Sequence, residues 1–193
     1  MTQTHNPATT LALIRDFFVA KNPEMRKDSL LRLAHAYPLL PEAAHILRLP
    51  DDSSHPYWRE LEYAFNRIFV GPGPIPAPPY ASVYLNHDKC LMGTGTLRVR
   101  ALMHSLHLSV PHEGHDPDDF LPYELDLYLA LTALSPAAVD AQARHWFLHE
   151  HLPHWLTLFI RQAQEANTTP AIALVLHLLE HICLPQNTEG FPD

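Results

Sequence analysis

The chain has 193 residues, 47% of them apolar and only 18% charged, which is typical of a globular protein and not of a disordered one. Thirteen basic and 21 acidic residues give a formal net charge of -8, which disfavours binding to nucleic-acid phosphates and favours a basic partner. With two cysteines, Cys90 and Cys183, neither a disulfide framework nor a cysteine-based zinc site is expected.

The first segment, MTQTHNPATTLALIRDFF, lacks the basic region and the uninterrupted apolar run of a signal peptide. The longest uncharged apolar segment, TTPAIALVLHLL, is far shorter than the roughly 20 residues that span a bilayer. We therefore expect one folded domain, residues 1–193, in the cytoplasm and without a membrane span.

Apolar residues with helical spacing begin near the N-terminus, where Leu11, Ile14 and Phe17 recur along one face. The segment KDSLLRLAHAYPLL continues the pattern, with Ser29 as the predicted N-cap. A third helix is predicted over HPYWRELEYAFNRIFV, with Pro56 in its first turn.

A loop rich in proline and glycine, GPGPIPAPPY at residues 71–80, interrupts the helices in the middle of the chain. Five prolines and two glycines in ten residues predict a stiff turn and not a flexible linker. Beyond it, ASVYL is predicted to be a short extended piece, and TGTLRVRALMHSLHL a helix that starts at residues 93–96.

The second half of the chain also predicts helices. FLPYELDLYLALTAL is apolar on nearly every face, so it is expected at the centre of the core. SPAAVDAQARHWFLHEHL, PHWLTLFIRQAQEAN and TTPAIALVLHLLEHICL each begin with a proline in the first turn. Because no segment alternates as a strand does, the sequence predicts an all-α bundle with the proline-rich loop in its middle.

Four acidic residues lie in the loop of residues 109–119, immediately before the apolar segment. One of them is expected to cap the following helix, because a carboxylate accepts hydrogen bonds from the free N–H groups at a helix N-terminus. Asp118 or Asp119 is the better candidate, since a cap at Asp116 would place Pro122 inside the helix. The remaining acids predict a negatively charged site for a basic ligand.

Two histidine–aspartate pairs raise an enzymatic alternative. His87–Asp88 and His115–Asp116 are similar to the metal-binding pair of HD-class phosphohydrolases, which are helical and metal-dependent. That pair belongs on a helix, whereas Pro117 places the second pair in a loop.

A run of histidines also has ligand-like spacing. His145 and His149 are four residues apart, with His151 and His154 close behind, and Pro153 is predicted to restart the helix between the last two. Histidines at helix ends more often cap carbonyl groups or face solvent, so no metal site is predicted. No nucleotide fingerprint or nucleophile motif occurs either, and neither a cofactor nor a catalytic residue is predicted.

Four segments, NRIFVGPGPIPAPPYASVYL, LMGTGTLRVR, DPDDF and HLPHW, resemble the TorD/DmsD family of redox-enzyme maturation chaperones in their order and separation. The likeness runs from about Trp58 to about Phe159. It implies an all-helical fold without catalytic activity. The family's acidic motif falls on residues 116–120, where Asp119 matches the key acid and Phe120 replaces the usual histidine.

The resemblance implies that the chain binds the twin-arginine signal peptide of an apo molybdoenzyme catalytic subunit, such as a dimethyl sulfoxide or trimethylamine N-oxide reductase. Such a chaperone delays export until the molybdenum cofactor is inserted. A nitrate-reductase-type assembly chaperone is the alternative within the same class. The resemblance leaves open whether the Tat translocon or the molybdenum-cofactor machinery is a further partner, and whether the chain is a monomer or a domain-swapped dimer.

In this hypothesis the acids attract the arginine pair, aromatic side chains contact the apolar part of the peptide, and residues 71–80 form a rigid wall beside them. It predicts that Pro79 and Asp119 lie close together. The peptide-binding residues that the resemblance implies are Phe65, Ile68, Phe69, Pro79, Tyr80, Tyr84, His87, Gly93, Asp116, Pro117, Asp118, Asp119 and Phe120.

Overall fold

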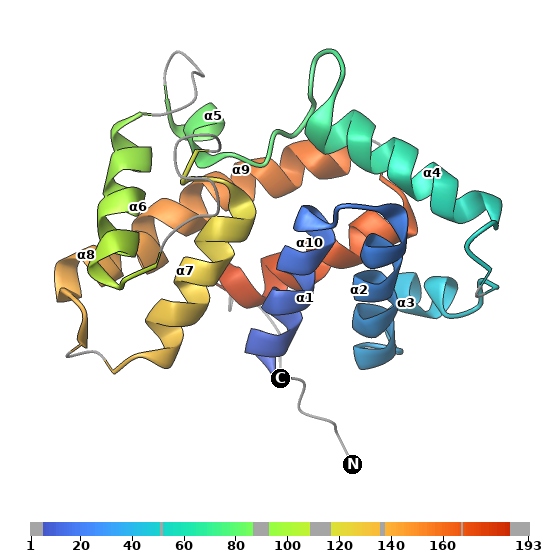
Figure 1. The fold of residues 1–193 in the computed structure, drawn as a ribbon, viewed down its shortest axis with the longest axis horizontal. Helices are drawn as coiled ribbons and strands as arrows, with labels where there is room; N and C mark the ends of the chain where they lie inside the picture. Colours follow the sequence, from blue (N-terminus) through green and yellow to red (C-terminus); the bar gives the residue numbers. More distant parts are fainter. Residues whose placement is uncertain are drawn as a thin grey trace, which may run out of the picture.

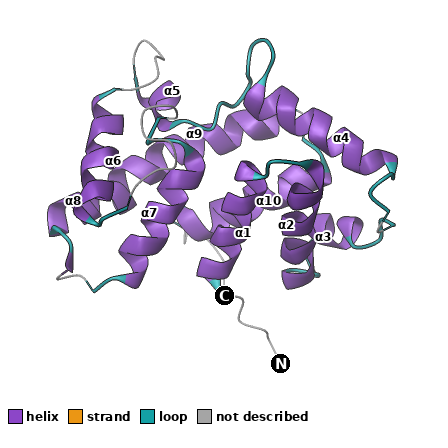
Figure 2. Cartoon of the chain, in the orientation of Figure 1, coloured by secondary structure: helices purple, strands orange, loops and turns teal. Residues whose placement is uncertain are grey.

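The computed structural model describes residues 6–50, 52–86, 93–108, 117–135, 138–166 and 168–185. Helices α1 to α4 lie on one side of the molecule, α5 to α8 lie on the other, and α9 and α10 run between the two groups (Figure 1). All elements in these ranges are helical (Figure 2), apart from a single bridge between Tyr80 and Phe120. The predicted all-α class is confirmed.

The helices, in chain order, are α1 (Pro7–Val19), α2 (Pro23–Ala36), α3 (Pro41–Ile46), α4 (Pro56–Phe65), α5 (Ala81–Leu85), α6 (Thr94–Ser105), α7 (Leu121–Ala133), α8 (Ala141–His145), α9 (Leu152–Glu165) and α10 (Pro170–Cys183). Two π-helical segments complete them: Asn66–Val70 extends α4, and Trp146–His151 joins α8 to α9. No helix in the described part of the chain is long and apolar enough to cross a membrane.

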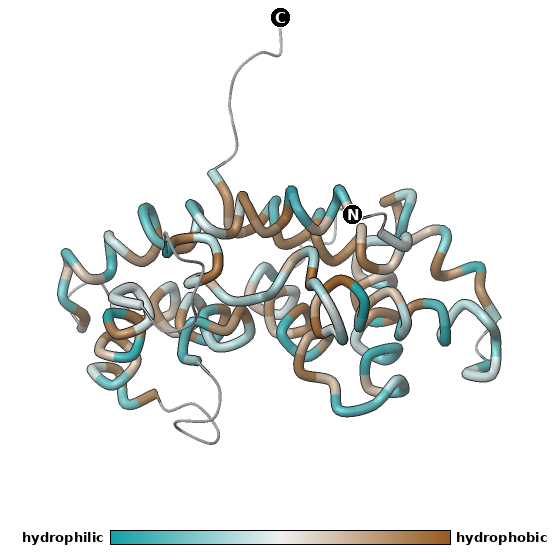
Figure 3. Tube along the Cα trace, turned by 90° about the horizontal axis from the view of Figure 1, so that it is seen from above, coloured by the Kyte–Doolittle hydropathy of each residue, from teal (hydrophilic) through white to brown (hydrophobic). Residues whose placement is uncertain are grey.

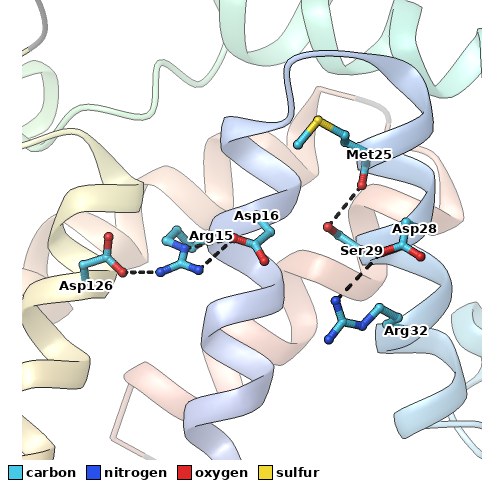
Figure 4. Close-up of polar contacts among 7 residues, drawn as sticks. All are labelled: Arg15, Asp16, Met25, Asp28, Ser29, Arg32 and Asp126. Carbon is cyan, nitrogen blue, oxygen red and sulfur yellow. Dashed lines mark hydrogen bonds and ion pairs between the residues drawn. The ribbon is translucent and has the colours of Figure 1, made fainter. Parts of the chain in front are cut away.

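Side chains just before the helices cap several of them. Asn6 and Asn22 accept hydrogen bonds from backbone N–H groups at the starts of α1 and α2, and Thr169 does so for α10. The predicted cap at Ser29 is wrong, because Pro23 already opens the helix at its first position. Ser29 lies inside α2, where its hydroxyl donates to the Met25 carbonyl oxygen at 3.2 Å (Figure 4).

Two further expectations differ from the structure, the first at ASVYL and the second, described below, at the central helix. ASVYL is not extended but forms α5, which Asp119 caps from another segment, an interaction that local sequence does not reveal. The predicted helix with Pro153 in its first turn is present as α9, but it follows the π-helical segment without a break. Such a turn already departs from the regular hydrogen-bond pattern, so the missing proline N–H costs little there.

The most buried helix is α10, and not α7 as predicted. Buried side chains lie on nearly every turn of α10, whereas three successive side chains of α7, at residues 128–130, are only partly buried. The tube in Figure 3 shows apolar and polar residues alternating along the helices, as expected where one side of each helix faces the core. The predicted spine was therefore wrongly placed, since composition alone does not tell a central helix from a neighbouring one.

A cluster of aromatic rings joins the N-terminal helices to α4 and α9. Phe17, Phe18, Phe65 and Phe69 are each at most 6% exposed, and Phe159 is fully buried. Their ring centroids are 5.2 to 6.2 Å apart in mostly tilted or edge-on arrangements. The cluster connects helices that are far apart in the sequence.

Charged side chains also link α1, α2, α4 and α7 to one another. Arg15 of α1 donates to Asp126 of α7 at 2.7 Å and to Asp16 at 2.8 Å (Figure 4). Arg26 of α2 places its guanidinium 3.7 Å from the centroid of the Phe65 ring and forms an ion pair with Glu62. These contacts hold α1, α2, α4 and α7 in a fixed arrangement.

The aromatic cluster provides a test of the fold. The mutation Phe159→Ala should lower the free energy of unfolding by about 3 to 5 kcal/mol, because it removes a fully buried ring and leaves a cavity. Leu39→Ala, at a side chain that is 95% exposed, should change it by less than about 0.5 kcal/mol. Urea unfolding followed by circular dichroism measures both, and equal losses in the two variants would contradict this packing.

Candidate functional site

The proline-rich loop and the acidic segment lie against each other. The Ala81 N–H donates to the Asp119 carbonyl oxygen at 3.0 Å, and the Leu121 N–H donates to the Pro79 carbonyl oxygen at 2.9 Å. Between these two bonds the Tyr80 and Phe120 rings stack, with their centroids 5.0 Å apart. The predicted proximity of Pro79 and Asp119 is confirmed.

Asp119 is fully buried and caps a helix. Its Oδ2 accepts a hydrogen bond of 2.6 Å from the Ser82 N–H, at the start of α5. The expected cap of α7 by Asp118 or Asp119 is therefore wrong, because α7 begins after Phe120, which gives it no side-chain hydrogen bond. The other carboxylate oxygen of Asp119, Oδ1, has no hydrogen-bond partner in the described part of the chain.

Asp118 is also turned inward. Its side chain is 4% exposed, and its Oδ2 accepts hydrogen bonds from Nε and Nη2 of Arg100, at 2.7 and 2.5 Å. Pro117 beside it is buried. Both described acids of the motif thus have internal partners, whereas Asp116 and His87 lie outside the described residues.

The three predicted residues on the helix before the loop belong to the core. Phe65, Ile68 and Phe69 are 4%, 0% and 3% exposed, so they do not border an open groove as the resemblance implied. The π-helical turn that carries two of them directs their side chains toward the aromatic cluster of α1 and α9. Their contribution to a surface site is indirect, through the position of the loop.

Two other predicted residues lie next to this core. The Tyr84 ring stacks on Trp155 with 5.9 Å between the centroids, and burial raises the pKa of its hydroxyl, which has no hydrogen-bond partner among the described residues. Gly93 precedes α6, where a Cβ atom would collide with the side-chain amide of Asn86. Its lack of a side chain lets the ends of α5 and α6 approach closely.

Aromatic side chains that remain partly exposed form a strip along the paired segments. The strip consists of Tyr80, Phe120 and Tyr123, all of intermediate exposure. Phe120 stacks on Tyr80 and meets Tyr123 edge-on, with 5.4 Å between the latter centroids. We call these three residues the aromatic strip, and it is a partly accessible apolar surface next to the acids in the sequence.

A buried polar cluster beside the strip was not predicted. Glu124 of α7 is fully buried, and its carboxylate oxygens lie 2.7 Å from Nε2 of His151 and 2.9 Å from Nε1 of Trp155. His151 is 4% exposed and stacks on Phe147. The sequence signal was the lone acid in the apolar run LPYELDLYL, because a buried charge requires a polar partner.

The charge state of this cluster follows from its burial. Burial raises the pKa of Glu124, while His151 and Trp155 act in the opposite direction. The raised pKa favours the protonated carboxyl group of Glu124, which then donates to Nε2 of His151 and accepts from Nε1 of Trp155.

Two of the other described histidines, His145 and His149, lie close together. The rings of His145 and His149 have centroids 4.9 Å apart. Within the described ranges, no group of three or more His, Cys, Asp or Glu side chains could hold a metal ion.

The fold matches a solved structure over most of its length. A candidate redox enzyme maturation protein from Archaeoglobus fulgidus superposes with a TM-score of 0.63, covering 93% of this chain and 97% of that one at 20% identity. At this identity the match defines the fold, an all-helical bundle shared with that protein.

The chain belongs to the nitrate reductase delta subunit family, whose model matches residues 27–161. Chaperone protein TorD of a Psychrobacter species is 30% identical over 88% of this chain and 87% of its own length. The Tat proofreading chaperone DmsD of Salmonella typhi is 30% identical, but that alignment covers 53% of this chain and 50% of DmsD. The resemblance seen in the sequence is thereby confirmed.

The Glu124 cluster can be tested by substitution. Glu124→Leu should lower the free energy of unfolding by about 3 to 5 kcal/mol, because it leaves the buried Nε2 of His151 and the Nε1–H of Trp155 without a hydrogen-bond partner. Glu124→Gln should cost much less, since its amide oxygen accepts from Trp155 and its amide nitrogen donates to His151. Similar losses in the two variants, measured by urea unfolding, would contradict this hydrogen bonding.

The same glutamine variant tests the pKa. The folded protein holds the Glu124 proton more tightly than the unfolded chain, whose ordinary value is 4.5. This stabilisation is present below that value and is lost as the pH rises through the raised pKa. The free energy of unfolding of the wild type should therefore fall relative to Glu124→Gln as the pH rises above about 4.5. A difference that stays constant as the pH rises would show that the pKa is not raised.

Proposed function

We propose that the chain is a cytoplasmic chaperone, not an enzyme, that binds the twin-arginine signal peptide of a molybdoenzyme catalytic subunit before export. The relatives named as Tat proofreading chaperone and as chaperone TorD support this class. The observation that carries the proposal is the pairing of residues 79–81 with residues 119–121, which sets the aromatic strip beside two carboxylates.

The two halves of such a peptide need different surfaces. Its apolar stretch would pack on the aromatic strip, where stacked rings offer apolar area at little entropic cost. Its arginines would be attracted to Asp118 and Asp119. Asp118 is already paired with Arg100, and Asp119 is buried, so an incoming guanidinium would displace Arg100 or reach Oδ1 of Asp119 after a local opening.

Assembly of the client would follow capture of the peptide. The catalytic subunit in its apo form is the proposed partner, held until the molybdenum cofactor is inserted and then released toward the Tat translocon. The molybdenum-cofactor machinery would therefore act before this release, and the Tat translocon after it.

A nitrate-reductase-type assembly chaperone is the second candidate, favoured by the description of the family model. Such a chaperone would bind a terminus of its client without a twin-arginine requirement, so the two candidates differ in the peptide they select. The phosphohydrolase alternative is contradicted, because the relatives in this family are named as chaperones.

The proposal is tested by isothermal titration of the whole protein with a synthetic twin-arginine signal peptide. Replacing the two arginines of the peptide by lysines should weaken binding by about tenfold, because lysine keeps the charge but loses the bidentate fork. No binding of any signal peptide would refute the proposed function. Equal affinity for the two peptides would favour the nitrate-reductase-type alternative.

The two halves of the site can be separated with variants. Asp119→Asn should weaken peptide binding by about 1 to 3 kcal/mol while keeping an oxygen for the Ser82 N–H. The matched control is Asp28→Asn, which removes an exposed carboxylate at 3.8 Å from Arg32 on the distant α2 (Figure 4). Equal losses from the two variants would indicate only a general effect of net charge.

Phe120→Ala should weaken binding by about tenfold through loss of the stacked surface. Tyr63→Ala removes an aromatic side chain that is 73% exposed on α4 and should leave the affinity unchanged. If Tyr63→Ala weakens binding as much as Phe120→Ala, the aromatic strip is not the site.

A further inference from the structure

A pocket lies next to the buried Glu124 cluster, where α5, α6 and the segment Trp146–His151 meet. Because the aromatic strip is the first candidate site, we call this one the second pocket. It has a volume of about 250 Å³. None of the three residues of the aromatic strip lines it. Its lining residues are Leu85, Asn86, Thr94, Gly95, Arg98, Trp146, Glu150, His151 and His154.

His151 presents a hydrogen-bond donor to this pocket. Its side chain is 2% exposed and Nε2 is engaged by Glu124, so only Nδ1 is left. When the protonated Glu124 carboxyl group donates to Nε2, the neutral ring carries its own proton on Nδ1, because a neutral imidazole has one N–H. Nδ1 lies next to Gly95, 4.0 Å from the position that a Cβ atom would take there. No partner for Nδ1 occurs among the described residues.

Arg98, an exposed residue of α6, contributes a cation. Its guanidinium carbon lies 3.8 Å from the centroid of the Trp146 ring, and no carboxylate in the described part of the chain pairs with it. The one acid that lines the pocket, Glu150, has a side chain that is 63% exposed and lies 3.8 Å from His145. Among the described lining residues, the cation of Arg98 and the imidazole of His151 thus stand beside one carboxylate, Glu150, which is largely exposed.

The backbone adds further donors. Thr94 and Gly95 form the first turn of α6, whose N–H groups have no carbonyl partner within the helix. The missing side chain at Gly95 leaves space in front of His151. The buried imidazole N–H, the guanidinium and the first turn of α6 are thus the three kinds of donor that recognise an oxyanion.

We propose that this pocket binds an oxyanion, namely the phosphate or carboxylate group of a small ligand. The Nδ1–H of His151 and the guanidinium of Arg98 donate to it, and Gly95 allows it to approach. This site does not depend on signal-peptide binding, and a protein that binds no peptide would still take up the anion.

The experiment is a titration of the whole protein with sodium sulfate and, separately, with sodium acetate, against sodium chloride at matched ionic strength. Both the heat and the NMR signals of the histidine ring nitrogens are followed. Sulfate is a tetrahedral dianion and acetate a planar carboxylate, so comparing their affinities distinguishes a phosphate-like ligand from a carboxylate ligand. We expect saturable binding of at least one, with a shift of the His151 Nδ1 signal.

Two variants and one control complete the test. Arg98→Gln should weaken binding by about tenfold or more. Gly95→Ala should weaken it as well, because the methyl group would sit 3.7 Å from Cε1 of His151, an ordinary contact that fills the space without straining the fold. Arg32→Gln on α2 removes the same charge from an exposed side chain and should leave the affinity unchanged. The melting temperatures of Arg32→Gln and Gly95→Ala should match that of the wild type.

Three results would overturn the proposal. The first is that neither sulfate nor acetate binds saturably above the chloride control. The second is that Arg98→Gln and Arg32→Gln lose equal affinity. The third is that the His151 signals do not move on binding. Signal-peptide binding by the Gly95→Ala variant is measured in parallel, so that a failure of this site is distinguished from a failure of the proposed chaperone function.

Discussion

The short pairing between residues 79–81 and residues 119–121 is the contact on which both sites depend. Two backbone hydrogen bonds and the cap from Asp119 to Ser82 fix the start of α5 against the start of α7. Five residues are too few for a helix to be stable by itself, so α5 exists only because this external cap and its packing against α9 hold it. Tyr80 lies before α5 and Asn86 after it, and these positions set the aromatic strip and the edge of the second pocket.

The buried Glu124 cluster fixes the other side of the same region. Glu124 comes from α7, whereas His151 and Trp155 come from the π-helical segment and α9. Hydrogen bonds to a buried carboxylate are strict in direction and distance, so they set the rotation of α7 relative to α9 in a way that leucine packing alone does not. The Tyr84 ring then stacks on the same Trp155, which ties α5 to this arrangement.

The fold class, most helices and the proximity of Pro79 and Asp119 could be predicted from the sequence. These depend on apolar periodicity, on proline and asparagine at helix starts, and on an extended resemblance, all of which are encoded locally. Sequence analysis did not place α5, whose cap comes from a residue 37 positions away, or distinguish α10 from α7 as the central helix. It also assigned Phe65 and Phe69 to a groove, because a stripe of aromatic residues has the same pattern whether it lines a surface or a core.

The acids explain why the candidate site was only partly predictable. Counting carboxylates in the loop suggested a surplus, but charge in a sequence carries no information about which way a side chain points. Asp118 pairs with Arg100, Asp119 caps α5, and Glu124 is hydrogen-bonded to His151 and Trp155, so all three stabilise the interior. Burying each carboxylate without a partner would cost several kcal/mol, roughly the whole margin by which small domains are stable. Any basic ligand that uses Asp118 or Asp119 must therefore supply hydrogen bonds at least as good as those it displaces. A guanidinium, with its rigid fork of donors, meets this requirement better than an ammonium group does.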